Sequence, residues 1–142
     1  MGEPLPLAGI KVVEMTVAVA GPAAGMILGD WGADVVLVEA PGGSRGGLSA
    51  LAGVPVESQY QDSPQGYMDN RGKRSVVLDM KTDEGKAAME QLLSGADVFL
   101  SNFRAQALEV SSHAIYVHRT ACDVGVISER LLVVASWFFV DF

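Results

Sequence analysis

The chain has 142 residues and a mass of 14.9 kDa, which suits a single domain. With 49% hydrophobic and 19% charged residues, it can bury a core and does not have the composition of a disordered protein. Ten Lys and Arg against 17 Asp and Glu give a net charge of −7, so a broad positive surface for nucleic acid is excluded. Any phosphate must then be bound locally, by one or two cations and by backbone N–H groups.

Cysteine content and targeting signals favour a cytoplasmic protein. The single cysteine, Cys122, cannot form an internal disulfide, and no cysteine–histidine cluster has the spacing of a metal site. The longest apolar stretch, near residues 131–140, is shorter than the roughly 20 residues that span a bilayer. The N-terminus has no basic segment followed by a long apolar one, so we expect no secretory signal. From the apolar stretch and the cysteine–histidine spacing we also expect no membrane partner and no metal.

The first predicted elements are a strand, a helix and a second strand. Residues 9–16 alternate in character and are rich in β-branched side chains, which predicts a strand. A helix should begin near Ala20, with Pro22 in its first turn, and end near Trp31, with Gly32 as a left-handed stop. Residues 33–39 are apolar on both faces, as is typical of a buried parallel strand.

Glycine recurs at every fourth position of the first predicted helix, at Gly21, Gly25 and Gly29. One face of this helix is therefore nearly bare backbone, which can lie close to a sheet or to a ligand. Each glycine costs up to ~1 kcal/mol within a helix, so we infer that the close approach is required.

The middle of the chain alternates between loops and further elements. A glycine-rich loop follows at 40–47, and residues 48–72 show no clear period, which predicts a functional loop or a crossing to another element. The elements expected next are a strand at 74–80, a helix at 82–93 and a strand at 96–101. Thr82 should cap that helix and Gly95 should end it.

The order of these elements predicts the fold class. Strands that alternate with helices are typical of an α/β fold, here Rossmann-like and doubly wound around a mainly parallel sheet. Beyond about Val110 the composition changes, and only residues 130–136 again indicate a buried strand.

Three segments are candidate binding sites, and the first two have a plain structural alternative. The turn before Pro22 could present N–H groups to a phosphate or carboxylate, or its small residues could simply allow close packing. Lys73, Arg74 and Lys81 could hold phosphates, or could be solvated charges at the ends of a strand. The third segment, residues 102–104, combines an amide, an aromatic ring and a guanidinium that could bind a purine.

A nicotinamide or flavin site is the alternative that Glu39 suggests, because this acidic residue ends the second strand about where a ribose-binding acid would lie. The preceding turn has no G-x-G-x-x-G motif, since three residues separate Gly21 and Gly25. The sequence therefore disfavours a dinucleotide.

Several blocks of the sequence resemble the opening of the family III CoA-transferases, which also include the α-methylacyl-CoA racemases. These blocks are residues 6–14 (PLAGIKVVE), 20–22 (AGP), 28–39 (LGDWGADVVLVE), 73–75 (KRS), 78–85 (LDMKTDEG), 96–98 (ADV), 102–104 (NFR) and 107–108 (AL). Together they extend from about Leu5 to Glu109, and their order and spacing are specific.

The resemblance implies coenzyme A, free or as acyl-CoA, lying across the carboxyl edge of the sheet in a Rossmann-like large domain. The residues that it implies for the CoA site are Val19, Ala20, Leu78, Asp79, Met80, Lys81, Asn102, Phe103 and Arg104. It also implies an acyl-CoA and a carboxylic acid as substrates, and interlocked homodimers for full-length relatives.

In such transferases an aspartate takes the acyl group as a mixed anhydride, and CoA then forms an aspartyl-CoA thioester. The resemblance places this aspartate beyond the last residue of the sequence, so no catalytic residue is assigned here. We therefore expect no transferase turnover from this chain alone.

The chain departs from the family pattern at two places. Many relatives have an arginine where this chain has Ala40, and after Glu109 the family pattern is lost. The sequence thus divides into a CoA-binding part at 1–109 and a divergent segment at 110–142. Two alternatives stay open: a fragment of an α-methylacyl-CoA racemase, and a non-catalytic module that binds CoA or a nucleotide.

Overall fold

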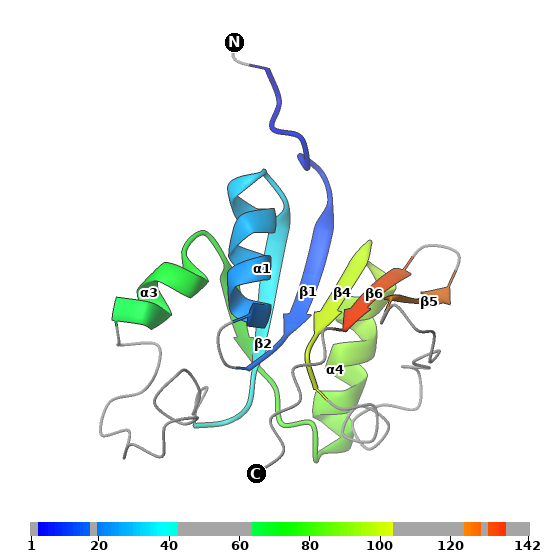
Figure 1. Cartoon of the computed structure of the whole chain (residues 1–142). Coiled ribbons are helices and arrows are strands. Elements are labelled where there is room, and N and C mark those ends of the chain that lie inside the picture. Colours follow the sequence, from blue (N-terminus) through cyan, green and yellow to red (C-terminus); the bar gives the residue numbers. More distant parts are fainter. Residues whose placement is uncertain (1–2, 18–19, 43–63, 104–123, 129–130, 136–142) are drawn as a thin grey trace.

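The computed structural model describes residues 3–17, 20–42, 64–103, 124–128 and 131–135 (Figure 1). Its elements are β1 (Lys11–Met15), α1 (Ala20–Asp30), β2 (Asp34–Glu39), α3 (Pro64–Asn70), β3 (Arg74–Val77), α4 (Asp83–Ser94), β4 (Val98–Ser101), β5 (Val124–Ser128) and β6 (Leu131–Ala135).

The strands form one six-stranded sheet in the order β3-β2-β1-β4-β6-β5. All neighbouring pairs are parallel except β5 and β6, which pair antiparallel at one edge. From β1 the chain builds outward to β3 and then returns to the other side of β1 with β4. The order of the strands therefore reverses between β1 and β4.

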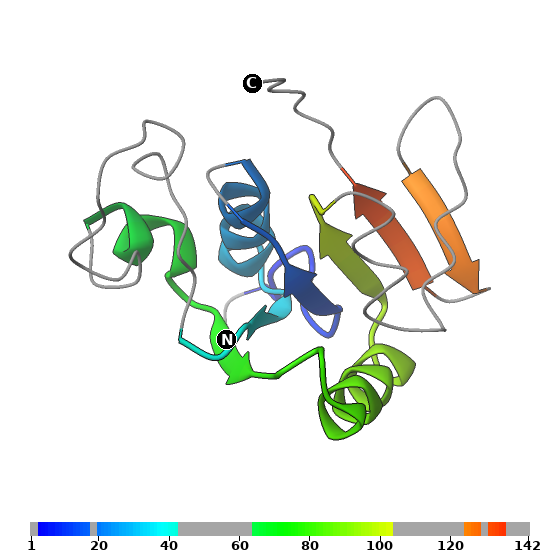
Figure 2. The same ribbon diagram turned by 90° about the horizontal axis from the view of Figure 1, so that it is seen from below.

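Helices cover both faces of the sheet, as Figure 2 shows with α1 above it and α4 below. Successive side chains of a strand point to opposite faces, so β1 contributes to two cores. Val12 joins the core under α1, whereas Val13 joins the core under α4 around Phe99 and Met89. The prediction of a doubly wound, mainly parallel α/β sheet is confirmed.

The predicted helix boundaries agree with the structure, and several strands are shorter than expected. Thr82 caps α4, since its side-chain oxygen accepts a hydrogen bond from Gly85 N at 3.0 Å. Gly32 has a φ of 101°, in the left-handed region. The third strand ends at Val77 rather than at residue 80 because the main-chain oxygen of Asp79 accepts from both Thr82 N and Thr82 Oγ1.

Two elements were not expected from the sequence. The helix α3 lies inside residues 48–72, where no period was visible, and packs beside α1. The strand β5 lies in the segment that differs from the family pattern, and β6 occupies 131–135 of the strand predicted at 130–136.

Two of the three glycines of α1 allow the helix to lie directly on β1. A Cβ on Gly21 would lie 2.6 Å from Thr16 Cβ, and a Cβ on Gly25 would lie 2.7 Å from Glu14 Cδ and overlap Oε2. At Gly29 the nearest atom would be Val35 Cγ2, at 3.8 Å. The close approach that the glycine spacing indicated is therefore made to the sheet, at Gly21 and Gly25.

The substitution Gly25→Ala should lower the free energy of unfolding by about 2–3 kcal/mol, because the new methyl group has no space beside the Glu14 carboxylate. Gly29→Ala in the same helix should instead raise it by up to ~1 kcal/mol, through helix propensity alone. Urea denaturation of both variants measures the difference. Equal effects of the two substitutions would show that α1 does not rest on Glu14.

Candidate functional site at the carboxyl edge of the sheet

The carboxyl ends of β1 and β4 meet where the strand order reverses. Open α/β sheets bind their ligands at such a point, outside the carboxyl ends of the strands. In Figure 1 the strand arrowheads of β1 and β4 point to this edge, and α1 begins beside it. The fold therefore selects this edge as the candidate site.

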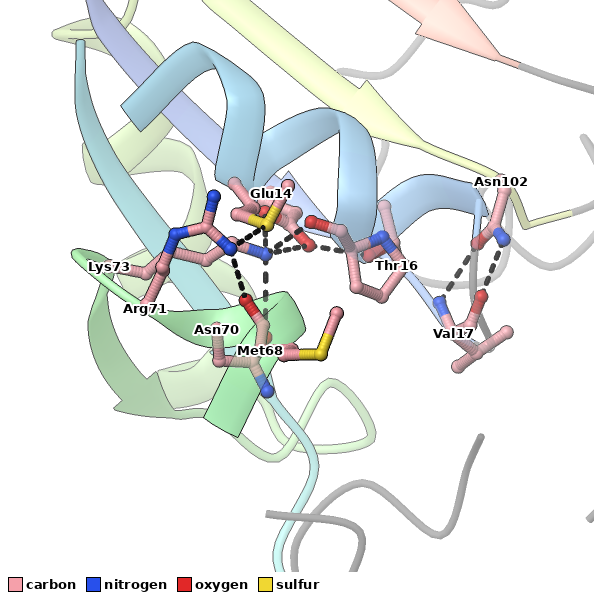
Figure 3. Close-up of polar contacts among 10 residues, drawn as sticks. Glu14, Thr16, Val17, Met68, Asn70, Arg71, Lys73 and Asn102 are labelled. Carbon is pink, nitrogen blue, oxygen red and sulfur yellow. Dashed lines mark hydrogen bonds and ion pairs between the residues drawn. The ribbon is translucent and has the colours of Figure 1, made fainter. Parts of the chain in front are cut away.

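Asn102 connects the two strand ends across this point (Figure 3). Its side-chain oxygen accepts a hydrogen bond from Val17 N at 2.9 Å, and its side-chain nitrogen donates one to Val17 O at 2.6 Å. One amide thus holds both main-chain groups of the residue with which the β1–α1 turn begins.

The segment after β3 lies at the same edge. Leu78 N donates to Glu39 O at 2.9 Å, and Lys81 N donates to Asp79 Oδ1 at 3.0 Å, while the side chain of Lys81 is exposed. Leu78 and Met80 pack against the same core cluster as Phe103, so the ends of β3 and β4 share an apolar base.

Of the remaining residues predicted from the sequence, the structure describes only some. Ala20 is the exposed first residue of α1, beside the turn. Val19 and Arg104, as well as Cys122, lie outside the described residues.

Two of the three cations considered for phosphate binding are engaged elsewhere. Arg74 forms an ion pair with Asp34 at 2.6 Å, at the amino ends of the strands. Lys73 is buried in an ion pair with Glu14, so it is neither a phosphate contact nor a solvated charge. Lys81 is the cation of this group that lies at the carboxyl edge with an exposed side chain.

The Glu14 carboxylate and the Lys73 ammonium are buried together beneath α1 (Figure 3). Their side chains are 0% and 1% exposed, and Lys73 Nζ lies 3.0 Å from Oε1 and 2.9 Å from Oε2 of Glu14. Oε1 also accepts from Thr16 Oγ1 at 2.6 Å, whereas Oε2 has the ammonium as an ion-pair partner but accepts no hydrogen bond.

Burial shifts both groups of this pair toward their neutral forms. Desolvation raises the pKa of Glu14, although the Lys73 charge and the Thr16 hydroxyl oppose that rise. Desolvation likewise lowers the pKa of Lys73, and the charges of Glu14 and Asp69 act in the opposite direction.

Sequence reasoning did not identify Glu14 as a buried residue. In an alternating strand it occupies a polar position, yet Val12, Glu14 and Thr16 share the face toward α1. The signal that could have found it is the pair Gly21 and Gly25, which leaves space for a side chain from the sheet.

A hollow of about 540 Å³ lies elsewhere, over the face that α4 partly covers. Its rim holds Lys11, Asp34 and Arg74, the first residues of their strands. Because this is the amino end of the sheet, we do not assign the hollow to the candidate site.

Neither a metal centre nor a membrane span is found in the part of the chain that the structure describes. No group of three His, Cys, Asp or Glu side chains there could hold a metal ion. No helix within the same ranges is long and apolar enough to cross a membrane.

Known proteins that are similar in sequence match the part of the chain that contains the candidate site. The family model described as CoA-transferase family III matches residues 7–112. The succinate–glutarate CoA-transferase of Agrobacterium fabrum is 44% identical over 108 residues, covering 72% of this chain and 26% of the relative. The (R)-2-hydroxy-4-methylpentanoate CoA-transferase of Clostridioides difficile is 38% identical over 104 residues, with coverages of 72% and 26%.

Among solved structures, a CAIB/BAIF family protein from Brucella suis matches with a TM-score of 0.61 and 35% identity, covering 75% of this chain and 28% of that protein. The chain thus spans about a quarter of the length of these relatives. The matched residues, 7–112, contain β1 to β4 and hence both strand ends of the candidate site. From this match and from the shared fold, the chain belongs to CoA-transferase family III.

Proposed function

We propose that this chain supplies the CoA-binding part of an enzyme that moves CoA between an acyl-CoA and a free carboxylic acid. The observation that carries the proposal is the family match over residues 7–112, which contain both strand ends of the candidate site. The relatives compared above are named as CoA-transferases, which supports this activity over that of a racemase. A reducing cytoplasm suits a chain with one cysteine.

The chemistry proposed for the whole enzyme explains why CoA must be held firmly. An aspartate carboxylate, which the family resemblance places after the last residue of this sequence, attacks the thioester carbonyl. This attack forms a mixed anhydride and releases CoA as thiolate. The thiolate then attacks the aspartyl carbonyl, giving aspartyl-CoA and the donor acid.

The acceptor carboxylate next attacks aspartyl-CoA and expels the thiolate once more. The thiolate then attacks the acceptor's carbonyl, which yields the new acyl-CoA and restores the aspartate. Between these steps the thiolate is free of both acyl groups, so binding at the remote nucleotide end must keep CoA in place.

In our proposal, different residues of the carboxyl edge bind different parts of CoA. The exposed ammonium of Lys81 is the phosphate partner at the adenosine end, beside Leu78, Asp79 and Met80. Asn102, Phe103 and Arg104 lie toward the adenine and pantetheine, and Val19 and Ala20 line the site from the β1–α1 turn. Such local binding by a few cations agrees with the acidic net charge.

Calorimetric titration with CoA tests the role of Lys81. We expect Lys81→Ala to weaken CoA binding roughly tenfold, the loss of one charge-assisted hydrogen bond. Lys86→Ala is the matched control, because Lys86 lies on α4, where its ammonium pairs with Asp83 at 3.8 Å. With dephospho-CoA as ligand, Lys81→Ala should lose less affinity if Lys81 binds the ribose phosphate.

A wild-type chain that produces no heat with CoA would overturn the proposed function. Equal affinities of Lys81→Ala and Lys86→Ala would instead leave CoA binding intact and remove Lys81 from the site.

A second prediction concerns Asn102 at the meeting point of the strands. Asn102→Ala removes both hydrogen bonds to Val17, so we expect weaker CoA binding together with a loss of about 1–2 kcal/mol in stability. Asp97→Ala is the control, since Asp97 Oδ2 accepts from Lys11 N at 2.8 Å at the amino ends of the same strands. This control should lose stability with an unchanged Kd for CoA, and a parallel loss of affinity in both variants would contradict the assignment.

A further inference from the structure

The buried ion pair beneath α1 does more than neutralise two charges. Lys73 Nζ also donates to Pro22 O at 2.8 Å and to Asn70 Oδ1 at 3.3 Å. Pro22 belongs to the first turn of α1, and Asn70 is the last residue of α3. Through Glu14 the same ammonium reaches β1, so one nitrogen atom joins three elements.

Stability alone does not account for such a pair. Removing two charges from water is costly, and well-packed apolar side chains of similar size often stabilise a fold as well or better. Apolar side chains, however, form no directional hydrogen bonds. An ammonium with bonds to a carboxylate, a helix carbonyl and an amide fixes where the helix begins relative to the strand.

The β1–α1 turn is held on both sides as a result. Asn102 of the β4 end holds the main chain of Val17 from one side. On the other side, Thr16 bonds to Glu14 and lies against Gly21, while Lys73 holds the carbonyl of Pro22. Val17, just after β1, and Pro22, in the first turn of α1, are therefore each fixed by a side chain from another element.

We propose that Glu14 and Lys73 are positioning residues that set the end of β1 and the first turn of α1 at the carboxyl edge in the geometry that CoA requires. This inference rests on the proposed function, because Ala20, a residue of the expected CoA site, is the first residue of α1. Neither Glu14 nor Lys73 contacts the ligand in this proposal. They act through Thr16, Gly21 and Pro22.

The test separates positioning from stability with a charge-free double variant. Lys73→Met alone leaves a buried carboxylate, and Glu14→Gln alone leaves a buried cation, so both single variants should lower Tm strongly. In Glu14→Gln/Lys73→Met neither position of the pair carries a charge, and Tm should recover most of that loss. The carbonyl of Pro22 nevertheless still lacks its ammonium donor.

We therefore expect the double variant to bind CoA at least about tenfold more weakly than the wild type at a temperature where both are folded. The amide of Val17 should also exchange with solvent at least about tenfold faster. The control is Asp34→Asn/Arg74→Met, which removes the ion pair at the amino ends of β2 and β3, with side chains 47% and 67% exposed. It should change neither the Kd for CoA nor the exchange of Val17.

The pH dependence of the Tm of Lys73→Met tests independently whether Lys73 keeps the buried Glu14 ionised. Without the ammonium, burial raises the pKa of Glu14 further, and Asp69 acts in the same direction. The folded state then holds a proton that the unfolded chain releases above its ordinary pKa of 4.5. The Tm of Lys73→Met should consequently fall, relative to wild type, as the pH rises from 5 to 8.

The outcomes distinguish the two proposals. A double variant that recovers Tm together with wild-type CoA affinity and Val17 exchange would overturn the positioning role and leave a purely structural pair. If the wild type itself does not bind CoA, the proposed function fails, while the exchange of Val17 still decides whether the pair fixes the turn.

Discussion

The contact between α1 and β1 depends on a carboxylate that lies where a helix side chain would otherwise be. Because Glu14 fills this space, Gly25 has no room for a Cβ and the helix approaches the strand closely. A buried carboxylate needs a cation, and Lys73 can reach it only if the residues that lead into β3 lie on the face that α1 covers. The position of α3 beside α1 follows from this one requirement.

Most of the sheet could be predicted from the sequence because local patterns determine it. Runs of Val and Leu indicated the buried parallel strands, and Thr82 and Gly32 indicated where helices begin and end. The missed elements depend on distant partners. The seven residues of α3 contain a glycine and show no apolar period, so their helix depends on packing beside α1 rather than on propensity.

The candidate site was less accessible to sequence reasoning, since charge alone does not reveal which partner a side chain finds. Lys73, Arg74 and Lys81 are equivalent cations in the sequence, yet the fold buries the first and pairs the second with Asp34. Only the third remains exposed at the carboxyl edge. Tertiary pairing between residues 59 positions apart, as for Glu14 and Lys73, leaves no local signal.

The side chain of Asn102, just after the end of β4, makes main-chain hydrogen bonds that a longer strand would otherwise make. Parallel strands exchange main-chain hydrogen bonds along their length, and β4 ends at Ser101. One residue later an amide side chain offers Val17 the same donor and acceptor that a further strand residue would offer. The distance between the main chain at residue 102 and Val17 thus depends on the length of one amide side chain. The link between the two strand ends can therefore change by the exchange of a single residue, while the strands that support it stay the same.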